Sequence, residues 1–146
     1  MTTEFPVLMR HATARDIPFL MSSYIRGLAA QSPWDKLDPN WHSAATHTLA
    51  ERMLKQSVVV ACDPADPDQC FGWICFDDVR RVLYWIYVKK AYRQAGLGTA
   101  LMEFAFLSVG PESDAIRITH KTDSIGWHTE RWNLVYDSHS LVTIAK

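Results

Sequence analysis

Apolar positions recur with helical spacing early in the chain. Between Ile17 and Leu28 they fall three or four residues apart, and this spacing gathers them on one face of a helix. Thr13 or Asp16 is expected to cap the helix, because these residue types accept hydrogen bonds from the free N–H groups of the first turn. Pro18 fits only within that first turn. The pattern therefore predicts an amphipathic helix near the start of the chain.

The middle of the chain contains short apolar runs rich in β-branched residues, which predict strands. Short polar turns separate these runs, so we expect neighbouring strands that pair as an antiparallel meander. The strands are expected at residues 57–62, 70–77 and 81–88, with turns at 63–69 and 77–78. Before them we expect a strand at 7–11, a loop at 31–41 and a second helix at 43–55.

The last third of the chain begins with a predicted helix at residues 96–109, which Gly110 and Pro111 end. A strand is expected to follow at 115–120. A strand, a helix and a strand with short connections indicate a right-handed crossover between parallel strands. The remaining predicted elements are a short helix at 123–131 and extended pieces at 133–136 and 140–144.

The composition is that of a globular protein, with 48% hydrophobic and 21% charged residues. A length of 146 residues suits a single domain over residues 1–146. The formal net charge of −1 argues against a nucleic-acid-binding protein, which usually carries a basic face. Three cysteines without a Cys-x-x-Cys pair and a start without a signal-peptide pattern favour a cytoplasmic protein. No apolar run is long enough to span a membrane.

The most informative stretch is the turn between the strand at 81–88 and the helix at 96–109. It contains Arg93, Gly96 and Gly98. The free N–H groups at a helix start and the helix dipole together favour a bound anion. An arginine can also hold a phosphate with two hydrogen bonds. We therefore expect a phosphate-bearing cofactor at this turn.

Two common phosphate-binding motifs do not fit the turn. A P-loop needs a lysine after its last glycine, and a dinucleotide fingerprint needs a third glycine where this chain has Leu101. The remaining pattern, Arg93-x-x-Gly96-x-Gly98, resembles the acyl-coenzyme A loop of the GNAT superfamily of N-acyltransferases. The wider string YVKKAYRQAGLGTAL at residues 87–101 resembles the same loop, and MRHATARDIPFL at 9–20 resembles the usual first strand and helix of that family.

The resemblance implies a mixed α/β (α+β) fold. Its sheet would be mostly antiparallel, with a central strand–cofactor loop–helix–strand unit and flanking helices. The implied cofactor is acetyl-coenzyme A, whose pyrophosphate is held by backbone amides of the loop and whose acyl carbonyl lies near a splayed strand end. The cofactor-binding residues are then expected to be Ile86, Tyr87, Val88, Arg93, Gln94, Ala95, Gly96, Leu97, Gly98 and Thr99.

Acetyl transfer to an amine needs a polarised carbonyl, a base for the ammonium group and a proton for the leaving thiolate. The family often uses a late tyrosine as the proton donor, and Tyr136 is the only tyrosine after the predicted helix at 96–109. Many relatives place a glutamate on the strand before the loop, but residues 81–88 include no acid. His120 is therefore the candidate base. Either side chain could instead be structural, with a satisfied hydrogen bond.

Aromatic side chains are candidates for the acceptor site. Tyr24, Trp34 and Trp41 fall in the first helix and the loop after it, the region that covers the acceptor in the family. They could form a slot for the substrate, or they could simply cover the sheet.

The sequence therefore predicts an N-acetyltransferase. The acceptor would be a primary amine of a small molecule, or a protein lysine or N-terminus. The alternative is a non-catalytic or regulatory protein of the same fold that holds coenzyme A structurally. Neither a nucleic acid nor a membrane is an expected partner, and a homodimer stays open. No metal site is expected, because His42 and His47 are five residues apart and do not share a helix face.

Overall fold

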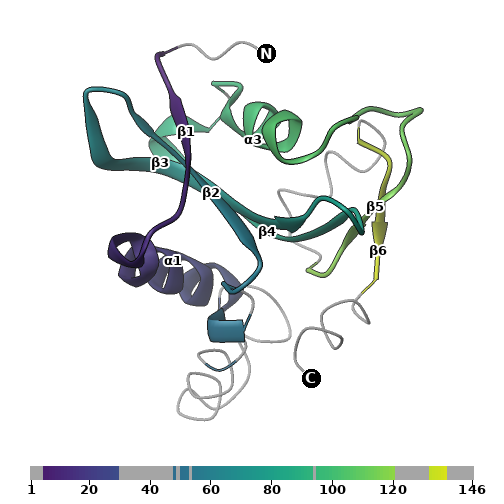
Figure 1. The fold of residues 1–146 in the computed structure, drawn as a ribbon, viewed down its shortest axis with the longest axis horizontal. Helices are drawn as coiled ribbons and strands as arrows, with labels where there is room; N and C mark the ends of the chain where they lie inside the picture. Colours follow the sequence, from purple (N-terminus) through teal and green to yellow (C-terminus); the bar gives the residue numbers. More distant parts are fainter. Residues whose placement is uncertain are drawn as a thin grey trace.

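The computed structural model of the protein describes residues 5–29, 48, 50–52, 54–93, 95–120 and 132–137. Within these residues, six strands form one sheet in chain order (Figure 1). The strands are β1 (Leu8–His11), β2 (Ser57–Asp63), β3 (Asp66–Asp77), β4 (Val82–Val88), β5 (Ile116–Ile118) and β6 (Leu134–Tyr136). The helices are η1 (Ala14–Asp16), α1 (Ile17–Ala29), η3 (Lys90–Tyr92) and α3 (Leu97–Ala105). Strands β1 to β4 pair antiparallel, whereas β4–β5 and β5–β6 pair parallel.

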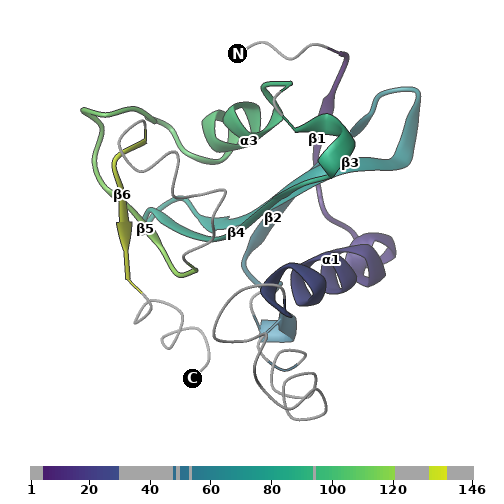
Figure 2. The same cartoon turned by 180° about the vertical axis from the view of Figure 1, so that it is seen from behind.

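A helix covers each face of the sheet. Figures 1 and 2 show α1 on one face and α3 on the other. Strand β2 serves both faces, because Val59 and Ala61 pack in the cluster with α3, whereas Val58 and Val60 pack in the cluster with Tyr24 of α1. Successive strand residues point to opposite faces. The continuous apolar run of β2 is therefore what a sheet covered on both sides requires.

This architecture confirms the mixed, mostly antiparallel fold that the sequence predicts. Strands β2, β3 and β4 form the expected meander, and α3 carries the chain from β4 to its parallel neighbour β5. Residues 48 and 50–52 are helical, within the helix predicted at 43–55. Residues 43–47, 49 and 53 of that prediction lie outside the described residues, as do the loop at 31–41 and the segments at 123–131 and 140–144. Leu54 and Lys55 form a turn, so the predicted helix extends too far at its end. None of the described helices has the length and hydropathy that a membrane span needs.

The start of β3 differs from the prediction. The strand begins at Asp66, inside the segment expected to be a turn. The turn is tighter because Asp63 Oδ1 accepts the Ala65 N–H at 2.9 Å, an arrangement that closes a turn within a few residues. Register irregularities next to Cys62 in β2 take up the extra residues of β3.

The end of α3 also differs. The helix ends at Ala105 rather than at residue 109, because Phe106 adopts an extended backbone and turns into the core, where it is 1% exposed. Arg81 donates hydrogen bonds to the carbonyls of Ser108 at 2.7 Å and Asp114 at 2.8 Å. The arginine thus fixes the chain after α3 in a non-helical path.

A buried ion pair fastens β1 to the start of α1. Asp16 is 6% exposed, and Arg10 donates two hydrogen bonds to its carboxylate at 2.7 and 2.8 Å. The Thr13 N–H donates to the same carboxylate at 2.7 Å. These bonds lower the pKa of Asp16 against the opposing effect of burial, with the Arg10 hydrogen bond as the largest cause. The stabilisation is therefore present above the ordinary aspartate pKa of 3.8 and is lost as the pH falls through the folded-state value.

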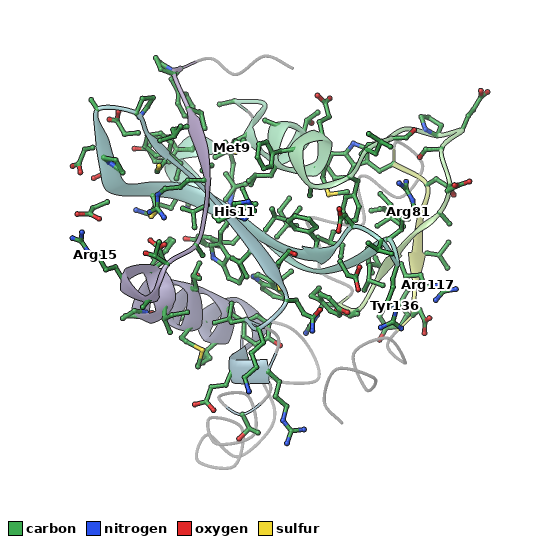
Figure 3. All side chains as sticks on the ribbon, in the orientation of Figure 1. Met9, His11, Arg15, Arg81, Arg117 and Tyr136 are labelled. Atoms are coloured by element: carbon green, nitrogen blue, oxygen red, sulfur yellow. The ribbon has the colours of Figure 1, made fainter. Side chains whose placement is uncertain are left out.

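We predict that Asp16→Ala lowers the free energy of unfolding by about 3 kcal/mol at pH 7, because it leaves Arg10 partly buried and unpaired. The matched control is Asp68→Ala. It breaks the pair between Asp68 and Arg15 at 2.9 Å, whose side chains are 66% and 80% exposed, and exposed pairs contribute less than about 1 kcal/mol. Figure 3 shows Arg15 at the periphery of the molecule. Equal losses for the two variants in urea unfolding would contradict this account of the ion pair.

Candidate active site at the end of β4

A β-bulge interrupts β4 at Tyr84. The register pairs Leu83 with Phe76 and Trp85 with Cys75, so Tyr84 is the extra residue opposite β3. The side chains of Tyr84 and Trp85 both pack in the cluster on the α1 face. In a regular strand they would point to opposite faces. The bulge therefore brings an additional aromatic ring against α1.

The bulge also directs two consecutive carbonyls toward β5. The Leu83 carbonyl accepts the Thr119 N–H at 3.2 Å. The next carbonyl, that of Tyr84, lies 2.8 Å from His120 Nδ1 and accepts the Thr119 hydroxyl at 3.2 Å. Successive carbonyls of a regular strand point in opposite directions. The second carbonyl is thus bonded by side chains and not by the β5 backbone.

Beyond the bulge, β4 continues without a β5 partner. The register between the two strands includes only Val82 and Leu83 of β4, whereas β4 extends to Val88. In the part of the chain that the structure describes, no other strand pairs with this side of β4. We call residues 84–88 on this side the β4 edge.

Two backbone amides point toward the β4 edge. The Lys89 N–H donates to the Phe71 carbonyl of β3 at 2.8 Å. Alternation along the antiparallel ladder then directs the N–H groups of Ile86 and Val88 away from β3. The Val88 carbonyl agrees with this orientation, because it accepts the Nε–H of Arg93 at 2.9 Å and not a bond from β3.

The turn after β4 ends in an open helix N-terminus. Gly96 caps α3 with φ 84° and ψ 2°, a left-handed conformation that glycine adopts without strain. Its carbonyl accepts the Ala100 N–H at 3.0 Å, so the N–H groups of Leu97, Gly98 and Thr99 have no partner within the helix. A Cβ placed on Gly98 would meet no heavy atom within 4 Å. The start of α3 therefore has amides available next to open space.

Basic side chains surround this turn. Lys90 and Arg93 are exposed, and Lys89 Nζ lies 5.2 Å from the centroid of the Phe19 ring. Arg93 uses Nε for the Val88 carbonyl, which ties the turn to the end of β4. Together with the positive end of the helix dipole, the exposed cations of the turn favour an anion at the start of α3. Lys89 instead lies against α1, on the opposite face of the sheet.

His120 connects the bulge to α1. Its Nδ1 lies 2.8 Å from the Tyr84 carbonyl, and its Nε2 lies 2.9 Å from the Tyr24 hydroxyl. Nδ1 also lies 2.8 Å from the Thr119 hydroxyl, which can donate or accept. A carbonyl oxygen only accepts hydrogen bonds, so we assign the proton to Nδ1 and the acceptor role toward Tyr24 to Nε2. Burial lowers the pKa of His120 to about 4 despite the opposing hydrogen bond to Tyr84. The imidazole is therefore neutral near pH 7.

Three rings pack edge to face around this histidine. The Tyr24 and Trp85 centroids are 4.8 Å apart, and the His120 centroid lies 5.6 Å from Tyr24 and 5.1 Å from Trp85. A Cβ on Gly27 would lie 2.8 Å from the Trp85 ring, so glycine lets the ring approach α1. Burial raises the pKa of Tyr24, which keeps its hydroxyl protonated as a donor.

Tyr136 lies away from this cluster. It pairs with Ile118, which pairs with Leu83, and paired residues share a face of the sheet. Leu83 and Ile118 pack in the cluster with α3, so Tyr136 faces the α3 side, where it is 53% exposed. Figure 3 shows it near Arg117, by β5 and β6.

The structure thus brings Tyr24 and His120 together and places Tyr136 on the opposite face. The described residues of the predicted loop lie along the β4 edge and the start of α3, whereas Gln94, Trp34 and Trp41 lie outside the described residues. Neither the Tyr84 carbonyl nor Trp85 was predicted from the sequence. The apolar run of β4 carries no alternation that could reveal a bulge.

The comparison with protein families decides the assignment. A family model described as the acetyltransferase (GNAT) family matches residues 28–130, which is most of the chain. The chain belongs to the GNAT family of acetyltransferases. The family generally uses acetyl-coenzyme A and acts on amine-bearing substrates. A comparison with curated protein sequences finds no match.

Solved structures support the GNAT fold. A protein from Pyrococcus furiosus is similar with a TM-score of 0.56 and 20% identity, over 86% of this chain and 91% of that one. The apo form of YjaB from Escherichia coli has a TM-score of 0.52 and 17% identity, over 69% of this chain and 65% of that one. A structure from Corynebacterium glutamicum, of histone acetyltransferase HPA2 and related acetyltransferase, has a TM-score of 0.52 and 19% identity, with coverage of 68% and 70%. At these identities the likeness shows the fold.

We predict that His120 makes the stability of this GNAT protein depend on pH between 6.5 and 4. The unfolded histidine titrates near 6.5 and the folded one at about 4. The unfolded state therefore binds the proton first as the pH falls, and the free energy of unfolding decreases over this window by roughly 3 kcal/mol. Above pH 6.5 the titration of His120 does not change the free energy of unfolding. Urea unfolding at pH 7, 6 and 5 should show a slope that His120→Asn largely removes, and an unchanged slope in that variant would refute the assignment.

Proposed function

We propose that this GNAT protein transfers the acetyl group of acetyl-coenzyme A to an amine-bearing acceptor. The observation that carries the proposal is the β4 edge, which no described strand pairs, leading through the Arg93 turn to the open N-terminus of α3. The β4 edge can hold an acyl carbonyl, and the start of α3 can hold a pyrophosphate. The proposed acceptor is a primary amine, carried by a small molecule or by a protein lysine or N-terminus.

The residues of the turn fit the phosphate part of acetyl-coenzyme A. The space beside Gly98 lets an anion approach the backbone, and the amides from Leu97 to Thr99 are available to it. The guanidinium of Arg93 is exposed and would supply a cation there. The proposed binding residues also include Gln94, Ala95 and Gly96 of the same turn.

The proposed site for the acyl carbonyl is the β4 edge, with Ile86, Tyr87 and Val88. An amide N–H aimed at the carbonyl oxygen stabilises the negative charge that develops when the amine attacks. The thioester bond then breaks, and the departing sulfur takes a proton. Bound acetyl-coenzyme A supplies the acyl group and the thiolate leaving group.

Tyr136 and His120 are the proposed acid and base. The exposure of Tyr136 on the α3 face suits a donor that must reach a departing thiolate. His120 is neutral, but its Nε2 accepts from the Tyr24 hydroxyl, so proton removal by His120 would pass through that hydroxyl. Tyr24, Trp34 and Trp41 are the proposed acceptor-binding residues.

We predict that Gly98→Val weakens the binding of coenzyme A roughly tenfold or more, a loss of about 1.4 kcal/mol, because the new side chain occupies the space beside the amides. The unliganded melting temperature should change little, since no heavy atom lies within 4 Å of the added Cβ. Gly110→Val is the matched control, because Gly110 has equally open surroundings. Calorimetric titration with coenzyme A measures both variants.

Parent-like affinity of Gly98→Val for coenzyme A would contradict pyrophosphate binding at the start of α3. Gly96→Val adds a separate expectation, because its φ of 84° strains a β-branched residue. This variant should lose both stability and binding.

We predict that acetyl-coenzyme A releases free thiol when the protein is incubated with a panel of small amines and lysine-bearing peptides. Tyr136→Phe should bind acetyl-coenzyme A like the parent but turn over about a hundredfold more slowly in a single turnover, because it lacks the proton donor. Stoichiometric binding of coenzyme A with no thiol release for any amine would contradict catalysis and favour the non-catalytic alternative.

A further inference from the structure

We propose that Tyr24 and His120 act as a pair of positioning residues that fix the bulge of β4 and thereby aim the Ile86 amide along the β4 edge. The inference rests on the proposed function of that edge. Helix α1 would then help to align the acyl group. It would do so through a relay of hydrogen bonds from the Tyr24 hydroxyl to His120 and from His120 to the Tyr84 carbonyl.

The bulge leaves the Tyr84 carbonyl in need of a hydrogen-bond donor. The Leu83 carbonyl already accepts the Thr119 N–H, the last backbone donor that β5 offers to β4 in the described residues. The Tyr84 carbonyl points to the same side and needs another donor, because a buried carbonyl without a partner is strongly disfavoured. His120 Nδ1–H at 2.8 Å is the stronger of its two side-chain donors, since Thr119 Oγ1 lies at 3.2 Å.

Tyr24 determines which tautomer His120 adopts. A neutral imidazole has one N–H, which can reside on either nitrogen. The hydroxyl of Tyr24 donates to Nε2 at 2.9 Å and so holds the proton on Nδ1, where the Tyr84 carbonyl needs it. Nδ1 also lies 2.8 Å from the Thr119 hydroxyl, which can donate to an unprotonated Nδ1. Without the Tyr24 hydroxyl the proton can therefore move to Nε2, and Nδ1 then accepts from Thr119 and no longer donates to the Tyr84 carbonyl. Tyr24 therefore acts on the bulge through His120.

Packing against Trp85 holds Tyr24 and His120 in place. Trp85, the residue after the bulge, packs edge to face against both rings. Gly27, one turn after Tyr24, leaves room for the indole against α1. Both tyrosine and histidine keep their uncharged forms near neutral pH, because burial raises the pKa of Tyr24 and lowers that of His120. Helix α1 and the bulge are thus fixed to each other.

The consequence concerns one end of the β4 edge. Ile86 is the second residue after the carbonyl that His120 holds, so a rotated Tyr84 peptide reorients the Ile86 amide. The start of α3 is reached only after Val88 and the Arg93 turn. Loss of the relay should therefore slow acetyl transfer while leaving the affinity for coenzyme A unchanged.

The test compares Tyr24→Phe with Ser23→Ala. Ser23 is the neighbouring residue of α1, and its buried hydroxyl accepts the Trp73 Nε1–H at 2.8 Å. Both variants lose a side-chain hydrogen bond of α1, but only Tyr24→Phe changes the contact with His120. We expect Tyr24→Phe to lower the single-turnover rate roughly 10- to 100-fold with the dissociation constant of coenzyme A within about twofold. Ser23→Ala should lose melting temperature and keep a parent-like rate.

A rescue variant separates positioning from general destabilisation. The amide nitrogen of His120→Asn can donate to the Tyr84 carbonyl and has no tautomer to fix, but it cannot act as a base. A higher rate for His120→Asn than for His120→Leu therefore measures positioning apart from the proposed base role, because both variants lack the base. Adding Tyr24→Phe to His120→Asn should then lower the single-turnover rate by less than about twofold. An additive loss in the double variant, or a parent-like rate for Tyr24→Phe alone, would overturn the relay while thiol release by the parent keeps the proposed function.

A readout without turnover completes the test. In the ligand-free protein, the NMR amide resonance of Ile86 should shift in Tyr24→Phe, and that of Gly98 should not. Ser23→Ala should leave both in place. If the parent releases no thiol, the proposed function fails and these resonances still decide the relay. An unmoved Ile86 resonance in Tyr24→Phe overturns it.

Discussion

A strand that bulges must satisfy one more backbone group than its neighbour can offer, and this constraint organises the centre of the molecule. At Tyr84, β4 directs a second carbonyl toward β5, and the side chain of His120 bonds it. His120 also bonds Tyr24 of α1, and the Trp85 ring packs edge to face against both side chains. The bulge also marks the point after which β4 runs without a β5 partner. Within the described residues, the contacts of α1 with Trp85 and His120 and the β4 edge without a strand partner thus have the same origin.

The two halves of the candidate site depend on different physics. The start of α3 relies on backbone geometry, because Gly96 supplies a positive φ and the first helical turn supplies amides. The β4 edge relies on packing and buried hydrogen bonds around His120. Arg93 connects the halves, since it lies in the turn before α3 and its Nε–H donates to the Val88 carbonyl at the end of β4. Substitutions in one half should therefore be separable from those in the other by measuring affinity and rate independently.

Local sequence features predicted the elements whose causes are local. The glycine turn after β4, the apolar strands of the meander and the amphipathic start of α1 each follow from spacing and turn chemistry. The bulge could not be predicted, because β4 is apolar on both faces. A break in the alternation of its side chains therefore leaves no mark in the sequence. The partnership of Tyr24 and His120 joins residues 96 positions apart, so no window of sequence contains it. The early end of α3 likewise depends on Arg81, which bonds the chain after the helix from the preceding hairpin.

The central claim is that a single strand–turn–helix unit holds both the phosphate and the acyl group of acetyl-coenzyme A. The most direct measurement is a map of backbone amide shifts in isotope-labelled protein titrated with coenzyme A and with acetyl-coenzyme A. Both ligands should shift the amides of Leu97, Gly98 and Thr99, and acetyl-coenzyme A should add larger shifts at Ile86 and Val88. Shifts that leave the start of α3 unchanged, or an acetyl group that changes nothing along the β4 edge, would contradict the account.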